Sequence, residues 1–421
     1  MTTRLYQTDV YAREWDATVV SIREKEDVSS KGRSALFEIL LDQSAFFPEG
    51  GGQSCDTGWI GSFPVIDVQE QDDLVIHTIS ADSGRSLPSE GDTVRCSIDW
   101  DRRFDNMQRH CGEHILSGAF YARCGGVHRG FHMGQEYMTI DISLEDDPTD
   151  PDTPRPEQID MALALECELR ANQVIWSDVP ITVYRFEDRA EAEAMPLRKA
   201  LAFDEDISIV CIGSPDNAAD CVACCGTHPA TSGQVGLIKI YKVENYKGMF
   251  RIYFEAGQRA LKDFDHKHEI LTNVANAYSS SIDDFPSKLR AKEEKLADAK
   301  NDLYHIKKAL IAKESAALDA VMAEDDAPVT VFPLEDLSLD DAFDMGKQYM
   351  GKCSRLILLY ARKNTSFILV SSGDPKCGAL VREYASFYQG KGGGNDTSAR
   401  AIFTTEENAM LFADLIEKHL R

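Results

Sequence analysis

Two histidines four residues apart carry the first chemical signal in this sequence. His110 and His114 lie in the segment DWDRRFDNMQRHCGEHILSGAF, whose apolar residues recur at helical spacing. On a helix this separation places both imidazoles on one face, one turn apart. Two imidazoles so placed can bind one metal ion, but the pair also occurs as ordinary buried polar residues, so it supplies only half of a metal site.

A second pair of metal-binding residue types, Cys224 and His228, lies in DCVACCGTHPATSGQVG, at residues 220–236. Zinc accepts imidazole nitrogen and thiolate sulfur in mixed tetrahedral sets, and the two pairs together make one such set carried by separate elements. Cys221 and Cys225 stand beside Cys224 and could replace it. Four protein ligands are typical of a closed structural site, unless one binds weakly or leaves to admit substrate or water.

The same histidine pair supports a competing interpretation. The letters HCGEH fit the H-x-x-E-H pattern of inverzincin proteases. There Glu113 would act as the general base on a zinc-bound water. A protease of this kind needs a carboxylate as third ligand on a later helix, and it leaves the CCGTH segment without a role. We therefore rank it last.

A glycine-rich segment, FFPEGGGQSCDTG at residues 46–58, is the third feature with chemical content. Adjacent glycines are unfavourable inside a strand. Gly51 and Gly52 therefore indicate either a loose turn or a loop whose backbone approaches a ligand closely, with the amide of Gln53 beside it.

The rest of the chain must position these residues, and its patterns indicate an α+β multidomain protein. Short β-branched runs near the N-terminus predict a small β-barrel, and mixed helix and strand patterns follow. Near the C-terminus, apolar strands and amphipathic helices predict an α/β domain. The expected domains are an N-terminal β-barrel at 1–95, a zinc-containing α+β domain at 96–257, a helical hairpin at 258–325 and a C-terminal α/β domain at 326–421.

The predicted hairpin rests on leucines spaced by seven residues, Leu289, Leu296, Leu303 and Leu310. Lys, Glu and Asp occupy the other faces, which indicates a solvated helix with a narrow apolar seam. An intermolecular coiled coil is the alternative. We favour an antiparallel hairpin because a helix of similar size precedes this one.

Composition narrows the class of protein. Hydrophobic residues make up 43% of the chain, and the eleven cysteines form no regular framework. Reduced thiols, no membrane span and a cytoplasmic location are the expectations. The net charge of −25 disfavours a polynucleotide partner. Because acidic residues cluster, as in residues 144–158, basic residues elsewhere could still form a binding face.

Three motifs, in this order, resemble one family. They are F-F-P-E-G-G-G-Q-x-x-D-T-G, R-R-F-D-x-M-Q-x-H-x-G-E-H-I-L-S and C-x-G-T-H-x-x-x-T/S-G. Together they resemble the editing domain of alanyl-tRNA synthetase and its free-standing relatives, the AlaX trans-editing proteins. The later G-K-G-G-G-x-D resembles the DHH-associated domain that follows the editing domain. The match covers nearly the whole chain in the layout of the long AlaX form, with no stretch for an aminoacylation domain.

The resemblance implies hydrolysis of the ester that joins serine or glycine to alanine-specific tRNA. It implies that Zn²⁺ is held by His110, His114, Cys224 and His228. It places Gly51, Gly52 and Gln53 in the amino-acid pocket. It also implies that tRNA is gripped by Arg102, Arg103, Lys391, Gly392, Gly393 and Gly394. The C-terminal part could mediate homodimerisation, as it does in related synthetases.

The implied chemistry suits the residues. An activated ester needs no covalent nucleophile, only a positioned water and stabilisation of the oxyanion. Selection of serine over alanine calls for a buried group that bonds the serine hydroxyl and is left unpaired with alanine. Gln53 or Thr139 could supply it. Glu113 stands where the family does not require glutamate, so it is either a base or a hydrogen-bonding neighbour of the ligands.

Three functions therefore compete, with the zinc-dependent trans-editing hydrolase favoured. The alternative is a zinc-stabilised tRNA-binding module without catalysis, and the third is the protease. If tRNA binds, one face should collect the basic residues Arg102, Arg103, Lys239, Lys242, Lys247, Arg251 and Lys391. One departure from the family is CCGTH in place of CGGTH, where the extra thiol of Cys225 is either inert or a second ligand.

Overall fold

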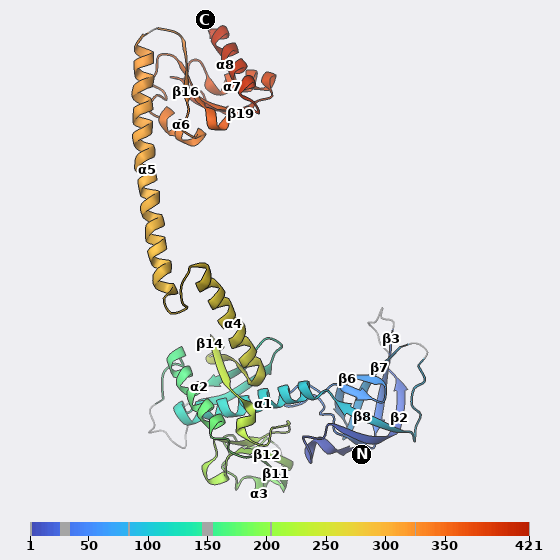
Figure 1. Ribbon diagram of the computed structural model, residues 1–421. Helices are drawn as coiled ribbons and strands as arrows, with labels where there is room; N and C mark the ends of the chain where they lie inside the picture. The colour runs from blue at the N-terminus through green and yellow to red at the C-terminus, as the bar shows by residue number, and fades with distance from the viewer. Residues whose placement is uncertain are drawn as a thin grey trace. The chain divides into compact units, whose positions relative to one another are not determined.

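A computed structural model describes residues 2–25, 34–82, 85–144, 155–202, 204–324 and 326–420. The chain forms two compact units, Met1–Leu271 and Thr272–Arg421. Helices and several sheets alternate along the chain, which confirms an α+β multidomain class (Figure 1). The finer division into four domains stays a prediction. Most of the acidic segment at 144–158 lies outside the described residues.

The first unit begins with a closed six-stranded barrel (Figure 1). Alternating residues of its first strand, among them Trp15, Ala17 and Val19, are buried in the barrel core, as a period of two requires. Two short strands, β1 (Thr3–Arg4) and β4 (Gln43–Ser44), pair in parallel beside it. In barrel order the strands are β2 (Glu14–Glu24), β3 (Ser34–Leu41), β7 (Leu74–Asp82), β6 (Phe63–Gln71), β5 (Gly58–Ile60) and β8 (Thr93–Ile98).

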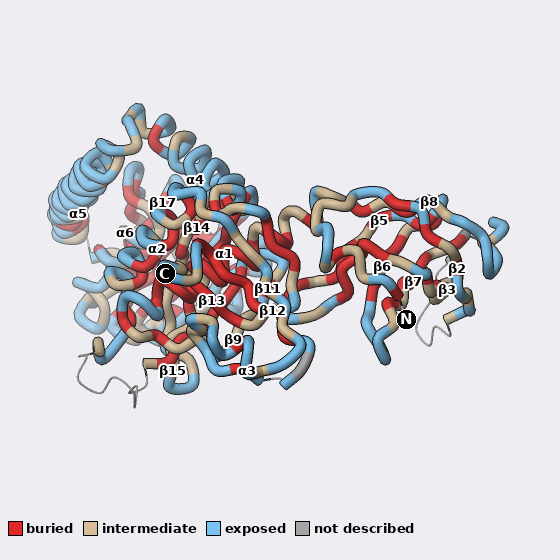
Figure 2. Tube along the Cα trace, turned by 90° about the horizontal axis from the view of Figure 1, so that it is seen from below, coloured by how far each residue is buried: buried red, intermediate tan, exposed pale blue. Residues whose placement is uncertain are grey.

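Helix α1 (Trp100–Cys124) is the central element of the first unit. It begins after Asp99, whose carboxylate accepts a hydrogen bond from the amide of Arg102, and ends at Gly125 in the left-handed conformation. Most of the helix is buried, as its colour in Figure 2 shows. Because it is enclosed on nearly every side, its polar side chains must find partners inside the protein.

A four-stranded antiparallel sheet lies against α1 and α2 (Met161–Trp176). Its strand order is β14 (Ile238–Tyr246), β15 (Met249–Ala256), β10 (Met138–Ser143) and β9 (Val127–Met133). Ile140, Ile252 and Phe254 face the two helices and form the main core with Ile115 and Cys167. The opposite face of this sheet carries polar and aromatic side chains.

A smaller, three-stranded sheet leads into the loop that carries Cys224. Its order is β11 (Ile181–Asp188), β12 (Glu205–Ile212) and β13 (Asp220–Ala223), with α3 (Arg189–Ala192) beside it. The loop after β13 begins with Cys224, so the end of this sheet is placed against the middle of α1.

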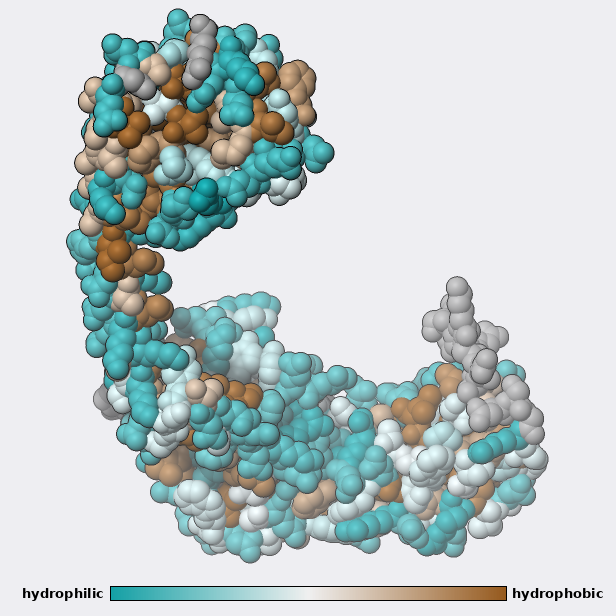
Figure 3. Space-filling view, turned by 45° about the horizontal axis from the view of Figure 1, so that its top comes forward, coloured by the Kyte–Doolittle hydropathy of each residue, from teal (hydrophilic) through white to brown (hydrophobic). Residues whose placement is uncertain are grey.

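Two long helices follow, α4 (Gly257–Ala277) and α5 (Phe285–Glu324). The apolar seam of α5 is exposed in its first half: Leu296 is 55% and Leu303 53% exposed. Figure 3 shows the hydrophobic atoms along this helix. Most of α4 belongs to the first unit and α5 to the second, so their packing as an antiparallel hairpin stays a prediction.

The C-terminal domain is a five-stranded mixed sheet with helices. Its order is β16 (Val329–Leu334), β17 (Leu356–Ala361), β18 (Ser366–Val370), β20 (Ser398–Ile402) and β19 (Lys391–Gly394), and its helices are α6 (Leu339–Gly346), α7 (Cys377–Tyr384) and α8 (Glu406–Leu420). The glycine motif is thus an edge strand. A Cβ at Gly392 would lie 1.9 Å from the carbonyl oxygen of Arg400, so glycine is required there.

The structure also bears on two expectations from composition, the state of the thiols and the presence of a membrane-spanning helix. All eleven cysteines are free thiols. Among the described helices, none combines the length and the apolar character needed to cross a bilayer.

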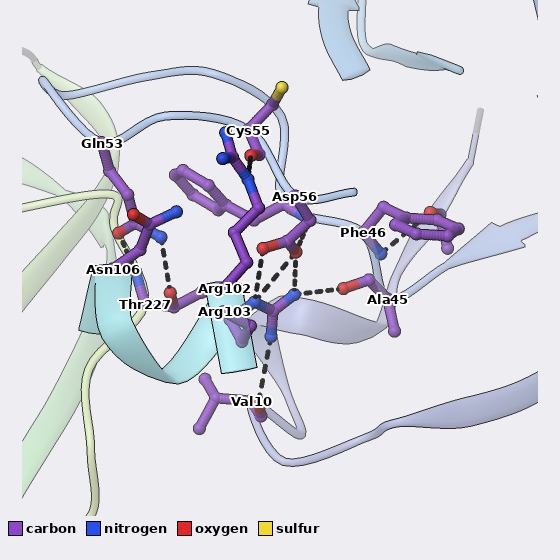
Figure 4. A network of polar contacts seen from close by, with 12 residues as sticks. Val10, Ala45, Phe46, Gln53, Cys55, Asp56, Arg102, Arg103, Asn106 and Thr227 are labelled. Carbon is purple, nitrogen blue, oxygen red and sulfur yellow. Dashed lines mark hydrogen bonds and ion pairs between the residues drawn. The ribbon is translucent and has the colours of Figure 1, made fainter. Parts of the chain in front are cut away.

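A buried ion pair fastens the barrel to α1 (Figure 4). The guanidinium of Arg103, which is 0% exposed, donates from Nε to both carboxylate oxygens of Asp56 at 3.0 and 2.9 Å. It also donates to the carbonyl oxygens of Val10 and Ala45. Asp56 in turn accepts the amide of Phe47 at 2.7 Å. The prediction that Arg103 contacts tRNA is therefore wrong, because every face of its guanidinium is occupied inside the protein.

We expect Arg103→Met to lower the free energy of unfolding of the first unit by about 3–5 kcal/mol, because it leaves the buried Asp56 carboxylate without its counter-charge. All four tryptophans lie in this unit, so urea denaturation followed by tryptophan fluorescence reports on it. Arg23→Met is the matched control, since the Arg23 side chain in its pair with Glu38 is 71% exposed, and should cost less than about 1 kcal/mol. Equal losses in the two variants would contradict this assignment.

Candidate metal centre

The two pairs singled out in the sequence meet in the structure. Helix α1 supplies His110 and His114, and the loop after β13 supplies Cys224 and His228. One ligand atom from each residue lies within 4.8 Å of the other three. The sulfur of Cys224 is 3.4 Å from Nε2 of both His110 and His228. These four side chains form a group that could hold a metal ion.

The structure also distinguishes the three neighbouring thiols. Cys221 lies on β13 opposite Cys211 of β12 and packs in a small apolar core. Cys225 is exposed, and its sulfur lies near Gly51. Among the described residues, Cys224 is the thiol that joins the histidines.

Glycines allow this close approach at two loops. A Cβ on Gly226 would lie 2.2 Å from Cε1 of His110, and a Cβ on Gly52 would lie 2.7 Å from the ring of Phe131. Gly52 also has a φ of +83°, which side chains rarely adopt. The amide of Gly226 donates to the Cys224 sulfur at 3.3 Å. Both loops therefore need glycine to pack around the histidine cluster.

Gln53 fixes the orientation of His110 through the ring nitrogen that does not face Cys224. Its Oε1 accepts from Nδ1 of His110 at 2.9 Å and from the amide of Thr227 at 3.1 Å, while its Nε2 donates to the Thr227 hydroxyl at 2.8 Å. The proton on Nδ1 leaves Nε2 of His110 free to face Cys224. Gln53 is 0% exposed. The prediction that it lies in the amino-acid pocket is therefore corrected, since its amide is occupied inside the protein.

The Nδ1 atom of His114, like that of His110, lies close to a side-chain oxygen. Its Nδ1 lies 3.3 Å from Oδ2 of Asp220, and Asp220 accepts two hydrogen bonds from Arg198, at 2.6 and 3.1 Å. All three side chains are less than a tenth exposed. Nε2 of His114 is buried and has no hydrogen-bond partner among the described residues. A buried nitrogen in this state indicates a missing partner such as a metal ion.

Two of the four donors, Cys224 and His228, already have the protonation states of metal ligands. Burial alone would raise the pKa of the Cys224 thiol, but the charges of His110, His114 and His228 hold that pKa well below its ordinary value. Burial lowers the pKa of His228 to about 4. A thiolate and a neutral imidazole are the forms that bind metal. Burial alone would lower the pKa of His114, but the charges of Cys224 and Glu113 raise that pKa well above its ordinary value, so His114 must lose a proton when a metal binds. The four donor types still fit an ion.

A cavity of about 570 Å³ opens beside the cluster. Glu113 faces it with Oε1, which accepts from the Ser117 hydroxyl at 2.6 Å and lies 3.5 Å from Nε2 of His128. Burial raises the pKa of Glu113, but His114 and His128 lower it to below its usual value. Other lining residues are Gly51, Phe131, Arg198, Lys199 and Ser208. The cavity thus combines two carboxylates, those of Glu113 and Asp206, with His128 and two cations next to the donors.

Thr139 does not belong to this cavity. It lies on β10 between Met138 and Ile140, which face α1, so its own side chain points to the opposite face of the sheet. There it lines a separate hollow with His132 and Tyr253. The predicted contact of Thr139 with the serine hydroxyl is therefore corrected for a substrate held in the cavity beside the metal donors, because Thr139 does not line that cavity.

Most of the expected basic face is neutralised locally. Lys239 pairs with Glu168 at 2.7 Å, Lys242 pairs with Glu244, and Arg251 makes two hydrogen bonds to Asp141 at 2.7 and 2.8 Å. Arg102 and Lys247 are exposed. Lys391 belongs to the second unit, so a single face shared with it stays a prediction.

Sequence reasoning missed several residues of the site. Asp220, His128 and the adjacent residues Arg198 and Lys199 reach it from three different segments and share no spacing with the histidine pair. One signal was present: Asp220 opens the DCVACCGTH segment that carries two of the donors.

Comparison with known families identifies two regions of the chain. Residues 2–102 match the family described as tRNA synthetases class II (A). Residues 207–253 match the family described as the threonyl and alanyl tRNA synthetase second additional domain. This matched segment includes Cys224 and His228.

Individual relatives cover much more of the chain. The alanyl-tRNA editing protein AlaX-L of Pyrococcus horikoshii is 28% identical over 95% of this chain and 94% of its own length. The alanine–tRNA ligase of Pyrobaculum aerophilum is 27% identical over 98% of this chain, and that of Halobacterium salinarum is 31% identical over 65% of it. The chain spans 44% and 28% of those two ligases, less than half of each.

Among solved structures, the C-Ala domain of Aquifex aeolicus alanyl-tRNA synthetase matches 22% of this chain and 89% of its own. Its sequence identity is 15% and its TM-score 0.20, too low to assign a fold.

The resemblance carried by the three motifs is confirmed over nearly the whole chain: this chain is similar to the alanyl-tRNA editing protein AlaX-L and to alanine–tRNA ligases.

Proposed function

We propose that this chain is an aminoacyl-tRNA deacylase that hydrolyses the ester of alanine-specific tRNA wrongly charged with serine or glycine. The observation that carries the proposal is the group of three histidines and one cysteine beside a cavity of about 570 Å³. A relative whose alignment covers 95% of this chain, at 28% identity, is named an alanyl-tRNA editing protein, which supports the same activity.

The proposed resident ion is Zn²⁺, because one thiolate and three imidazoles are donors that zinc accepts in a tetrahedral set. The ligands would be His110, His114, Cys224 and His228. When bound, such an ion supplies a fixed positive charge that can orient a polar group of the substrate.

The chain's own residues supply the remaining chemistry. Ester hydrolysis adds a water oxygen to the carbonyl carbon, breaks the bond to the ribose oxygen and returns a proton to that oxygen. Glu113 and His128 both line the cavity, with Oε1 of Glu113 3.5 Å from Nε2 of His128. Nε2 of His128 has no hydrogen-bond partner among the described residues, so these two side chains would together hold the water. Lys199, at the exposed rim, would face a phosphate of the terminal nucleotides. Gln53 and Asp220 would keep the two helix histidines turned toward the centre.

The other two functions are less well supported. A metalloprotease of the H-x-x-E-H type needs a later carboxylate as third ligand, whereas Cys224 and His228 occupy the place beside the histidine pair. In a tRNA-binding module without catalysis, the same cluster would only bind a metal that stabilises the fold. The cavity with its polar side chains favours catalysis over a purely structural site.

The activity is tested with tRNA(Ala) charged separately with radiolabelled serine, glycine and alanine. We expect rapid loss of the serine or glycine ester, with the alanine ester retained, because the editing reaction must spare the cognate product. Loss of neither wrong ester, while the tRNA still binds, would contradict the deacylase and establish the binding module.

The metal assignment is tested with neighbouring cysteines. We expect the purified chain to hold one zinc ion and Cys224→Ala to lose it, because one of four donors is removed. Cys225→Ala is the matched control, one residue away, and should keep stoichiometric zinc. Metal content by elemental analysis reads out both. Loss of zinc from Cys225→Ala, or its retention in Cys224→Ala, would overturn the ligand set.

Substitutions of Gln53 and Thr139, the two residues first predicted to select serine, should differ in their effect on zinc affinity. We expect Gln53→Ala to weaken zinc binding by about 10–100-fold, because His110 loses the acceptor that fixes its orientation. Thr139→Val should leave zinc affinity unchanged, since Thr139 lies on the far face of the sheet. Competition with a chromogenic chelator measures both affinities. Unchanged zinc affinity in Gln53→Ala would refute its positioning role.

A further inference from the structure

The outer face of the sheet β14-β15-β10-β9 has no role in the function proposed so far. Along β10 and β15, Ile140, Ile252 and Phe254 face the helices, so Arg251 and Tyr253 face outward. In register, Tyr253 lies opposite Thr139 on one side and Lys242 on the other. Aromatic and cationic side chains therefore gather on one open sheet face.

We propose that this outer face, defined by Tyr137, Tyr246, Arg251 and Tyr253, binds unpaired nucleotides of the tRNA by stacking. The inference rests on the proposed function, which requires a tRNA partner. It adds a docking surface on the far side of the sheet from the metal cluster, and it names the chemistry by which that surface recognises RNA.

The rings and cations on this face are arranged to accept a flat aromatic ligand. The rings of Tyr137 and Tyr253 pack edge to face, with centroids 5.2 Å apart and an interplanar angle of 67°, and together they form one aromatic surface. The guanidinium of Arg251 stacks 3.5 Å above the ring of Tyr246, and Nζ of Lys242 lies 5.5 Å from the ring of Tyr253. Tyr137 is 41% exposed. Aromatic rings and guanidinium planes are the surfaces on which unpaired bases stack.

The space between these side chains is large enough for a nucleotide. A hollow of about 610 Å³ is lined by Tyr137, Thr139, Arg251, Tyr253 and His132, and also by the exposed Glu136, whose carboxylate further lowers the positive charge of this face. The hydroxyl of Thr139 and the imidazole of His132 can hydrogen-bond a base edge. A sheet face with such rings can bind bases of any sequence, because every base has a π-face.

The charges on this face favour unpaired nucleotides over duplex RNA. Arg251 is held by Asp141, and Lys242 by Glu244, so the face carries little net positive charge. The whole chain has a net charge of −25. Duplex binding is driven by phosphate contacts and counterion release, which this face cannot supply in quantity. Stacking on bases gives affinity without a large positive charge.

The test measures binding of the full chain to uncharged tRNA(Ala) by fluorescence anisotropy. We expect the double variant Tyr137→Ala and Tyr253→Ala to bind at least about tenfold more weakly. The matched variant Tyr137→Phe and Tyr253→Phe should bind like the parent, because it keeps both rings. Trp59→Ala, at an exposed aromatic residue of the barrel, should have no effect. Circular dichroism checks that each variant is folded.

Two further measurements identify the ligand. A short single-stranded oligoribonucleotide should compete with the tRNA for the parent chain, and a duplex of equal length should not. The slope of log affinity against log salt should be no steeper than about −2, equivalent to two or three phosphates. Unchanged binding by the alanine double variant, equal loss in the phenylalanine variant, or competition by duplex alone would overturn the proposal. So would an absence of tRNA binding by the parent chain.

Failure of this proposal can be told apart from failure of the deacylase. If the face docks tRNA, the alanine double variant should raise KM for the mischarged tRNA and leave kcat unchanged. A parent chain that binds tRNA through these tyrosines but hydrolyses no ester would retain the docking face and refute only the deacylase. A parent chain that hydrolyses the serine ester with the same KM as the double variant would refute only the docking face.

Discussion

The buried ion pair between Arg103 and Asp56 is the constraint on which the rest of the first unit depends. Asp56 follows Gln53 by three residues in the barrel loop, and Arg103 precedes His110 by two turns of α1. Joining the two charges therefore brings the loop to the height of the metal cluster, where Gln53 can accept the proton of His110. The barrel and the cluster are one structural unit for this reason.

Along α1 the same principle recurs, since a helix buried on nearly every side must pair each polar group inside the protein. Arg109 makes two hydrogen bonds to the buried Glu255, at 2.8 and 2.9 Å. Five residues later on the same helix, His114 faces Asp220. Each pair compensates the cost of burying a charge and at the same time fixes the rotation of the helix. The two histidines can then present one face to the loop that carries Cys224.

Charge pairing also bears on how an acidic chain would bind the anionic partner that we propose. On the sheet face the cations are held by carboxylates of neighbouring strands, as Arg251 is by Asp141. The pairs leave neutral areas between acidic regions, and aromatic rings occupy one of them. Affinity for RNA on such a surface must come from stacking and from a few local contacts, since long-range attraction is absent.

The sequence by itself determined the donor types, their spacing and the class of fold, because helix and strand periods and metal-ligand pairs are local patterns. It could not choose among three adjacent cysteines, since that choice depends on which thiol faces α1. It misplaced Gln53, Thr139 and Arg103 for the same reason. Whether a polar side chain meets a cavity, a buried partner or the far face of a sheet is decided by contacts between segments distant in sequence, and only the tertiary structure contains those contacts.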